Sequence, residues 1–154
     1  MANRSTIYHP NPKGTGMALA LELYPASPEV PGKLKLEFAR QDSPEGVTFP
    51  RFDWENRRTI VLTPEEVEKV LEVFNGNTES IEDGKGLFVR TPTQAAAFRL
   101  RHVIDPVPAY EFQLVVREGA TATEDVREFN LTPTEAMMLY HALTAAMGVL
   151  VFGL

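Results

Sequence analysis

Cysteine is absent from the 154 residues of the chain, which excludes disulfide bonds, thiolate metal sites and cysteine nucleophiles. Histidine is scarce, and His9, His102 and His141 fall in three unrelated settings: a polar terminus, a strand-like run and a helix-like run. Neither these histidines nor the acidic residues stand at the spacing of convergent metal ligands. We therefore expect no metal, no cofactor and no enzymatic activity.

The chain also has little that directs a protein to a membrane or out of the cell. Residues 1–13 are polar and contain proline, without the apolar core of a secretion signal or the arginine-rich pattern of a transit peptide. The most apolar stretch, residues 142–154, is too short to cross a bilayer. We expect a cytoplasmic protein with no membrane partner, in which a flexible segment, residues 1–12, precedes a single domain over 13–154.

Positive charge is in short supply, since 15 basic residues face 21 acidic ones and the formal net charge is −6. This balance argues against a protein that coats nucleic acid by bulk charge. The charge is unevenly distributed, however, because acidic residues gather over residues 65–83. The basic residues of the strand-like runs are Lys33, Lys35, Arg57, Arg58, Arg99 and Arg101. A folded sheet can thus be locally basic on an acidic molecule.

A helix-start signal occurs twice. Leu62-Thr63-Pro64-Glu65-Glu66 returns as Leu131-Thr132-Pro133-Thr134-Glu135, each time after a strand-like stretch and before an amphipathic run. In each copy the threonine is an N-cap, the proline occupies the first helical position, and the glutamate three residues after the threonine completes a capping box. Such caps are common, and two helices that simply begin well are the alternative to a duplicated unit. We expect one unit used twice, over about 16–76 and 78–154.

Alternation of apolar and polar residues predicts strands, and a spacing of three to four predicts helices. The predicted strands are 17–23, 33–41, 57–62, a short one at 78–81, 87–90, 96–104, 110–116 and 125–131. The predicted helices are 64–74 and 133–151. Strands followed by a helix, twice over, indicate an α+β fold with antiparallel sheets and helices packed on one side.

The second predicted helix is apolar nearly all round, so it is buried on more than one side. Its own sheet supplies one partner, and a second subunit is the simplest other one. The residues predicted at this oligomer interface are Met138, Leu139, Ala142, Ala146 and Met147.

Several phrases, in this order along the chain, resemble the Whirly family of single-stranded-DNA-binding proteins. Residues 12–19, Pro-Lys-Gly-Thr-Gly-Met-Ala-Leu, are similar to the family's Lys-Gly-Lys-Ala-Ala-Leu, with the second lysine absent and two residues inserted. Residues 52–58, Phe-Asp-Trp-Glu-Asn-Arg-Arg, resemble its Tyr-Asp-Trp-Ser-Arg-Lys. Glu79-Ser80-Ile81-Glu82 with the following glycine-lysine turn, Val103-Ile104-Asp105-Pro106 with its next strand, and the closing residues 151–154 complete the likeness.

The resemblance implies two antiparallel four-stranded sheets packed with two helices, a homotetramer with the helices at its centre, and no catalysis. It also implies that outer strand surfaces hold single-stranded DNA, and by extension RNA, with low sequence specificity. Protection or organisation of single strands, transcription regulation and DNA repair are the processes it suggests. An acidic oligomeric scaffold of the same fold, with a protein or small-ligand partner, is the alternative.

Single-strand binding needs cations that follow phosphates and flat side chains on which bases stack. Two lysines or arginines two residues apart on one strand face lie about 7 Å from each other. Phe49, Phe52, Trp54 and Phe88 stand in or beside loops and are candidates for stacking, each worth roughly 1–3 kcal/mol per base. The predicted nucleic-acid-binding residues are Lys13, Lys33, Lys35, Phe52, Trp54, Arg57, Arg58, Arg99 and Arg101. The alternative is that these cations only solubilise a half-buried sheet and that Trp54 anchors its loop.

Overall fold

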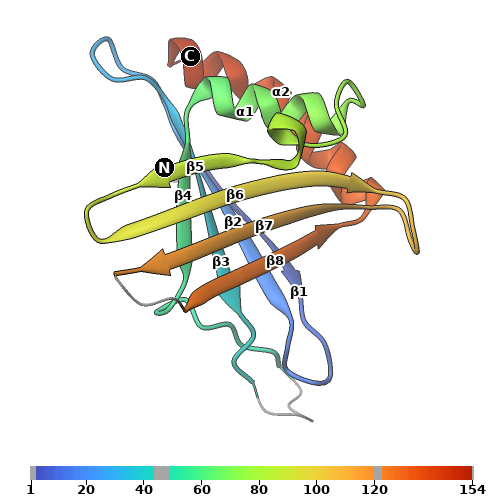
Figure 1. Cartoon of the computed structure of the whole chain (residues 1–154). Helices are drawn as coiled ribbons and strands as arrows, with labels where there is room; N and C mark the ends of the chain where they lie inside the picture. Colours follow the sequence, from blue (N-terminus) through green and yellow to red (C-terminus); the bar gives the residue numbers. More distant parts are fainter. Residues whose placement is uncertain (1–2, 44–48, 120–122, 154) are drawn as a thin grey trace.

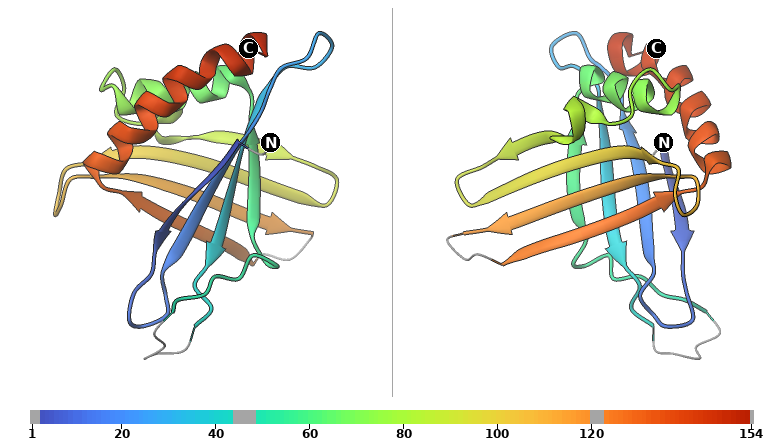
Figure 2. Two further views of the ribbon diagram at one scale, coloured as in Figure 1. Left: turned by 180° about the vertical axis from the view of Figure 1, so that it is seen from behind. Right: turned by 45° about the vertical axis from the view of Figure 1, so that its right-hand side comes forward.

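Two four-stranded antiparallel sheets cross each other, and two helices cover one end of the crossing (Figure 1). The computed structural model describes residues 3–43, 49–119 and 123–153. The sheet from the second half of the chain lies in front of the first sheet in Figure 1, with its strands running across those behind. Views from the back and from the side show the helices next to each other at the same end (Figure 2). The predicted α+β class with two antiparallel sheets and two helices is confirmed.

The first sheet has the order β1-β2-β3-β4. Its strands are β1 (Asn3–His9), β2 (Met17–Tyr24), β3 (Lys33–Arg40) and β4 (Arg58–Leu62). The last three confirm the strands predicted from alternation. The expectation of a flexible segment over residues 1–12 is wrong for β1, which pairs with β2 along its whole length. Ile7 of β1 also packs against the hydrophobic core, which gives this polar segment a reason to order. Residues 1 and 2 lie outside the described residues.

The second sheet has the order β5-β6-β7-β8. Its elements and the two helices are α1 (Pro64–Phe74), a 3-10 turn η1 (Ile81–Gly84), β5 (Leu87–Arg90), β6 (Gln94–Val103), β7 (Ala109–Glu118), β8 (Glu124–Leu131) and α2 (Pro133–Phe152). The short strand predicted at 78–81 is wrong, since only Ser80 makes an isolated bridge, to Arg101, and η1 follows it. Residue 154 of the expected closing phrase lies outside the described part.

Both helices begin as the repeated signal predicts. The Thr63 side chain accepts a hydrogen bond from the Glu66 amide, and the Glu66 carboxylate accepts one from the Thr63 amide, at 3.2 and 2.9 Å. Thr132 and Glu135 form the same pair of bonds at 3.1 and 3.0 Å. Each box satisfies donors that a helix start leaves free, which stabilises each helix by about 1 kcal/mol.

One face of each sheet meets the helices and the other sheet in a shared core. The alternating residues of β3 and β6 supply it from the two sheets, and both helices add their buried stripes. The largest fully buried side chains are Phe38, Phe98, Phe112, Phe129, Leu19, Leu34, Leu36, Leu62, Leu100, Leu114, Leu131 and Leu150. The opposite face of each sheet points away from this core and is the place to look for a binding surface.

One side of helix α2 packs on this core, and its C-terminal end is held by hydrogen bonds from a loop. Ala136, Leu143, Ala146 and Leu150 are buried. The β2–β3 connection reaches the last turn, where the amides of Ala26 and Gly32 donate to the carbonyls of Val149 and Leu150, each at 3.0 Å. A side chain at Gly32 would stand 2.4 Å from the Leu150 carbonyl oxygen, so only glycine permits this approach. Within the described residues α2 alone is long and apolar enough to span a membrane, a length that the expectation from residues 142–154 underestimated.

The two sheets are joined where they cross by a cluster of charges around Asp125. The Arg127 side chain is 5% exposed and donates to the carbonyls of Phe38 and Asn56, at 3.0 and 2.9 Å, and to Asp125. Arg58 and Arg40 of the first sheet donate to the same carboxylate at 2.7 and 2.8 Å. Burial raises the pKa of Asp125, but the hydrogen bonds from Arg127 and Arg58 outweigh it and lower the pKa to about 2.

This cluster predicts a dependence of stability on pH. The pKa of Asp125 falls from an ordinary 3.8 to about 2 on folding, so its contribution is present above pH 3.8 and is lost as the pH falls towards 2. We expect Asp125→Asn to lower the free energy of unfolding by ~2 kcal/mol at pH 7 and by much less at pH 2, measured by urea unfolding. Glu124→Gln is the matched control, because its pair with Arg117 is about half exposed and should be worth under ~1 kcal/mol. An equal loss at both pH values for Asp125→Asn would contradict this assignment.

Candidate nucleic-acid interface

The outer face of the first sheet carries cations that are already neutralised. Arg4 donates to Glu37 at 2.5 Å, Lys35 lies 3.2 Å from Glu22, and Arg57 also pairs with Glu37. Glu37 is 3% exposed. Burial raises the pKa of Glu37, but the hydrogen bond from Arg4 and the neighbouring positive charges outweigh it, and its pKa lies below the ordinary value. The predicted contacts Lys35 and Arg57 therefore hold a buried carboxylate before any phosphate arrives.

The aromatic residues predicted to stack bases on this sheet are also engaged. The Arg4 guanidinium lies 5.4 Å from the ring centre of Trp54, and the rings of Tyr8 and Phe52 are 5.4 Å apart. Ala18, Ala20 and Ala39 belong to this outer face, yet they are fully buried. The side chains of Phe52 and Trp54 therefore lie over part of this face, against Tyr8 and Arg4 of β1. Both rings are half-buried, so the packing interpretation of Trp54 describes what the structure shows.

The outer face of the second sheet is different, because an apolar row lies open on it. Phe88, Ala97, Val115 and Val126 are direct neighbours across the four strands β5 to β8. Phe88 is 69% exposed and Val126 is 39% exposed. These residues line an open groove of about 520 Å³. We call Phe88, Ala97, Val115 and Val126 the Phe88 row.

Arginines flank the Phe88 row on both sides. Arg90 lies one row beyond it and Arg99 lies one row before it, in both cases on the same face. Arg99 donates to the neutral amide oxygen of Gln113, and within residues 3–43, 49–119 and 123–153 neither Arg90 nor Arg99 forms an ion pair with a carboxylate. Arg117, in the row of Arg90, pairs with Glu124 at 3.1 Å. Prediction from sequence found Arg99 and considered Phe88, but it missed Arg90 and Arg117, which the alternation in β5 and β7 places on the same face.

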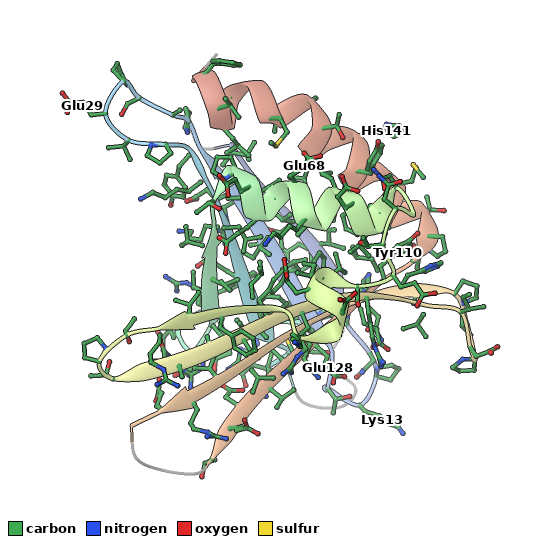
Figure 3. All side chains as sticks on the ribbon, turned by 45° about the horizontal axis from the view of Figure 1, so that its top comes forward. Lys13, Glu29, Glu68, Tyr110, Glu128 and His141 are labelled. Atoms are coloured by element: carbon green, nitrogen blue, oxygen red, sulfur yellow. The ribbon has the colours of Figure 1, made fainter. Side chains whose placement is uncertain are left out.

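The remaining predicted contacts are scattered. Lys13 lies at the tip of the β1–β2 connection (Figure 3), and Lys33 is the first residue of β3; both are exposed. Arg58 belongs to the cluster around Asp125 and also reaches Glu118 at 2.5 Å. Arg101 pairs with Glu111 at 2.7 Å. Of the nine predicted residues, Arg99 is thus the one that lies beside the Phe88 row without a carboxylate partner among the described residues.

The histidines and acidic residues of the described chain form no group of three or more that is able to hold a metal ion. His9, expected in a floppy terminus, instead lies in β1, stacks on Phe129 with ring centres 4.3 Å apart, and lies 2.8 Å from the Glu135 carboxylate. Burial raises the pKa of Glu135, but the hydrogen bonds that its carboxylate makes with His9 and Thr132 lower the pKa by more, so the net shift is downward. His9 therefore ties β1 to the start of α2.

This chain is similar to known proteins in its fold. No family model and no curated protein matches this chain in sequence. Among solved structures, WHY1 from Arabidopsis thaliana aligns with a TM-score of 0.77 and 17% identity, covering 99% of this chain and 87% of that one. The plant transcriptional regulator PBF-2 aligns with 0.76 and 18% identity, covering 97% and 82%.

A guide-RNA-binding protein complex bound to a guide RNA aligns more loosely, with a TM-score of 0.61 and 16% identity, covering 96% of this chain and 90% of that one. At identities this low the likeness establishes the fold and leaves each chain's ligand to its own side chains. The Whirly-like fold implied by the sequence phrases is confirmed.

Proposed function

We propose that this protein binds single-stranded nucleic acid on the outer face of its second sheet, with low sequence specificity and without catalysis. The observation that carries the proposal is Phe88, an aromatic side chain that is 69% exposed on an open apolar row between arginines. Solved proteins of this fold support it, since one of them is described as a guide-RNA-binding complex. Protection of single strands, transcription regulation and repair are the processes that such binding would serve.

The geometry suits an unpaired strand. Each base has a flat face that stacks on an aromatic ring, whereas the bases of a duplex are already stacked on one another. Arg90 lies in the row next to Phe88, about 7 Å away along the strand, so a phosphate beside a stacked base comes within its reach. The net charge of −6 limits affinity at a distance, and Arg90 supplies the positive charge that lies next to the Phe88 row.

Substitution of Phe88 and of the neighbouring Arg90 tests the proposal. We expect Phe88→Ala to weaken binding of labelled oligothymidine about 5- to 150-fold, because one stacked base contributes roughly 1–3 kcal/mol. Arg90→Ala should reduce the slope of log affinity against log salt by about 0.7, the value for one phosphate contact on a single strand. Fluorescence anisotropy in about 50 mM salt and above measures both effects.

Two matched controls remove the same groups elsewhere. Phe152 is 73% exposed at the end of α2, and Arg51 is exposed in the loop before β4. Phe152→Ala and Arg51→Ala should leave the affinity and the salt slope near those of the unchanged protein. Loss of binding in the controls but not in the Phe88 and Arg90 variants would move the site away from the second sheet. Absence of any salt-sensitive binding would reject the function.

We also propose that the protein is a homo-oligomer, with a tetramer as the arrangement implied by the resemblance, formed through the free side of α2. Met137 and Met138 are 48% and 67% exposed, and Ala142 is exposed beside them. Leu139 and Met147 are partly buried against the protomer's own core. Ala146, expected at this interface, is 7% exposed and packs inside the protomer, so it does not belong to the free side.

Charge on the free side of α2 should separate the subunits. Met138→Glu should give a soluble species of smaller mass by light scattering, because a carboxylate at an apolar interface is left unpaired. Thr134→Glu, at the exposed start of the same helix, is the control that should keep the mass of the unchanged protein. An unchanged mass for Met138→Glu would count against this interface.

The second candidate function is an acidic scaffold for a protein or small-ligand partner. The observation that favours it is the pairing of Lys35, Arg57 and Arg58 with carboxylates, which leaves little free positive charge on the first sheet. Arg101 of the second sheet is paired as well. Isolation of a defined protein complex that resists nuclease treatment, together with no oligothymidine binding, would favour the scaffold.

A further inference from the structure

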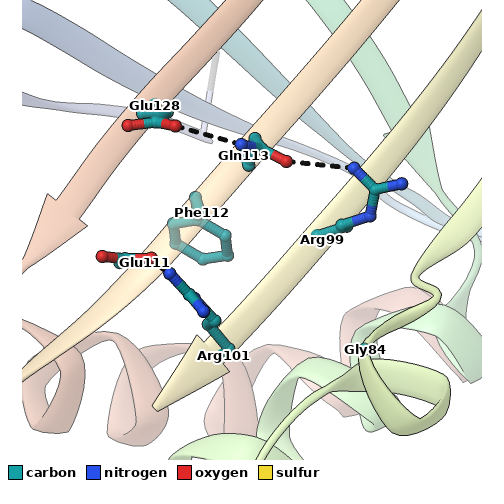
Figure 4. A pocket seen from close by; sticks show the side chains of 7 residues that line it. All are labelled: Gly84, Arg99, Arg101, Glu111, Phe112, Gln113 and Glu128. Atoms are coloured by element: carbon teal, nitrogen blue, oxygen red, sulfur yellow. Dashed lines mark hydrogen bonds and ion pairs between the residues drawn. The ribbon is translucent and has the colours of Figure 1, made fainter. Parts of the chain in front are cut away.

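A second concave site lies beside the Phe88 row on the same sheet face (Figure 4). It has a volume of about 320 Å³, at the lower end of the roughly 300–1,000 Å³ of small-ligand clefts. Its walls carry Arg99 on β6, Gln113 on β7 and Glu128 on β8, with Gly84 of η1 at the rim. These three polar side chains are neighbours across the strands.

Hydrogen bonds fix the order of donors and acceptors along this wall. The Gln113 amide oxygen accepts from Arg99 and its nitrogen donates to Glu128, both at 3.0 Å, as Figure 4 shows. Arg99 uses one of its five N–H donors in its hydrogen bond to Gln113, and the Glu128 carboxylate keeps further acceptor sites. The site therefore presents a row of donors on one side and a carboxylate on the other, with Gln113 locked between them.

The charges of the site select the class of ligand. Arg99 and Arg101 are balanced by Glu111 and Glu128, so an incoming phosphate would meet two carboxylates as well as two guanidinium groups. A neutral planar group that offers both acceptors and donors satisfies the wall better. Among the parts of a nucleic acid this describes a base edge.

The position of Arg99 is set by the chain around it. A side chain at Gly86 would stand 2.7 Å from Cγ of Arg99, so the bare backbone there lies close against the arginine stem. Glu82 and Asp83, the two residues that precede Gly84 in η1, both have positive φ, 52° and 54°, a conformation that costs about 1 kcal/mol or more per residue. Strain of this kind persists at ligand sites that the surrounding structure holds in place.

We propose that this site holds one guanine base of the bound strand, an inference that rests on the function proposed above. Glu128 accepts from the N1 and N2 hydrogens of guanine, and Arg99 donates to its O6 and N7 acceptors. Adenine and the pyrimidines lack this combination of acceptors and donors. The protein is then tolerant of sequence along the Phe88 row but prefers guanine at one position.

The test compares oligothymidine with the same strand carrying one central deoxyguanosine or deoxyinosine. We expect deoxyguanosine to tighten binding about tenfold, the effect of one good bidentate contact, and deoxyinosine, which lacks the N2 amine, to lose most of that gain. Glu128→Gln should bring the ratio of the two affinities close to 1. Glu68→Gln, which removes the same charge from the exposed side of α1 (Figure 3), should retain the tenfold ratio.

Equal affinity for the thymidine and guanosine strands would overturn the guanine site while the proposed function stands. If neither strand binds, the proposed function fails. Binding of free guanosine then tests whether the guanine site exists. Guanosine at millimolar concentration should shift the side-chain amide NMR signals of Gln113, and adenosine should not. No shift with guanosine, or an equal shift with inorganic phosphate, would overturn the inference.

Discussion

The buried guanidinium of Arg127 is the constraint on which the arrangement of this molecule depends. A cation that is 5% exposed must have all its donors satisfied, and Arg127 finds acceptors in the Phe38 and Asn56 carbonyls of the first half of the chain and in Asp125 of its own strand. No described side chain leaves a buried polar atom without a partner. Because these bonds form only when β8 crosses the first sheet at this place, they select one crossing of the two sheets, while the apolar face of each sheet is the one that is buried.

Much of the fold follows from local patterns. The capping boxes at Thr63 and Thr132 and the alternation in β3 and β6 depend on neighbours within a few residues, and each was predicted from the sequence. β1 was not, because a polar edge strand needs only Ile7 on its inner face and gains its order from pairing with β2. The strand predicted at 78–81 failed because the consecutive positive φ angles of Glu82 and Asp83 turn the chain into η1 instead.

The site was less predictable because pairing between distant residues decides which charges are free. Lys35 and Arg99 are alike in the sequence, each a cation at an alternating position of a strand. Lys35 meets Glu22 across β2, whereas Arg99 meets the neutral Gln113. For Arg58, the partner Asp125 is 67 positions away. Sequence patterns indicate the face of a strand on which a cation lies, and only the fold determines whether a carboxylate lies opposite.

The central claim is that an unpaired strand lies over β5 to β8 and not over the first sheet. Photocrosslinking of an oligothymidine that carries 5-iodouracil, followed by mass spectrometry of the attached peptide, locates the strand directly, because iodouracil reacts best with an aromatic ring stacked against it. The account predicts attachment at Phe88. Attachment at Trp54 or Tyr24, on the outer face of the first sheet, would contradict it.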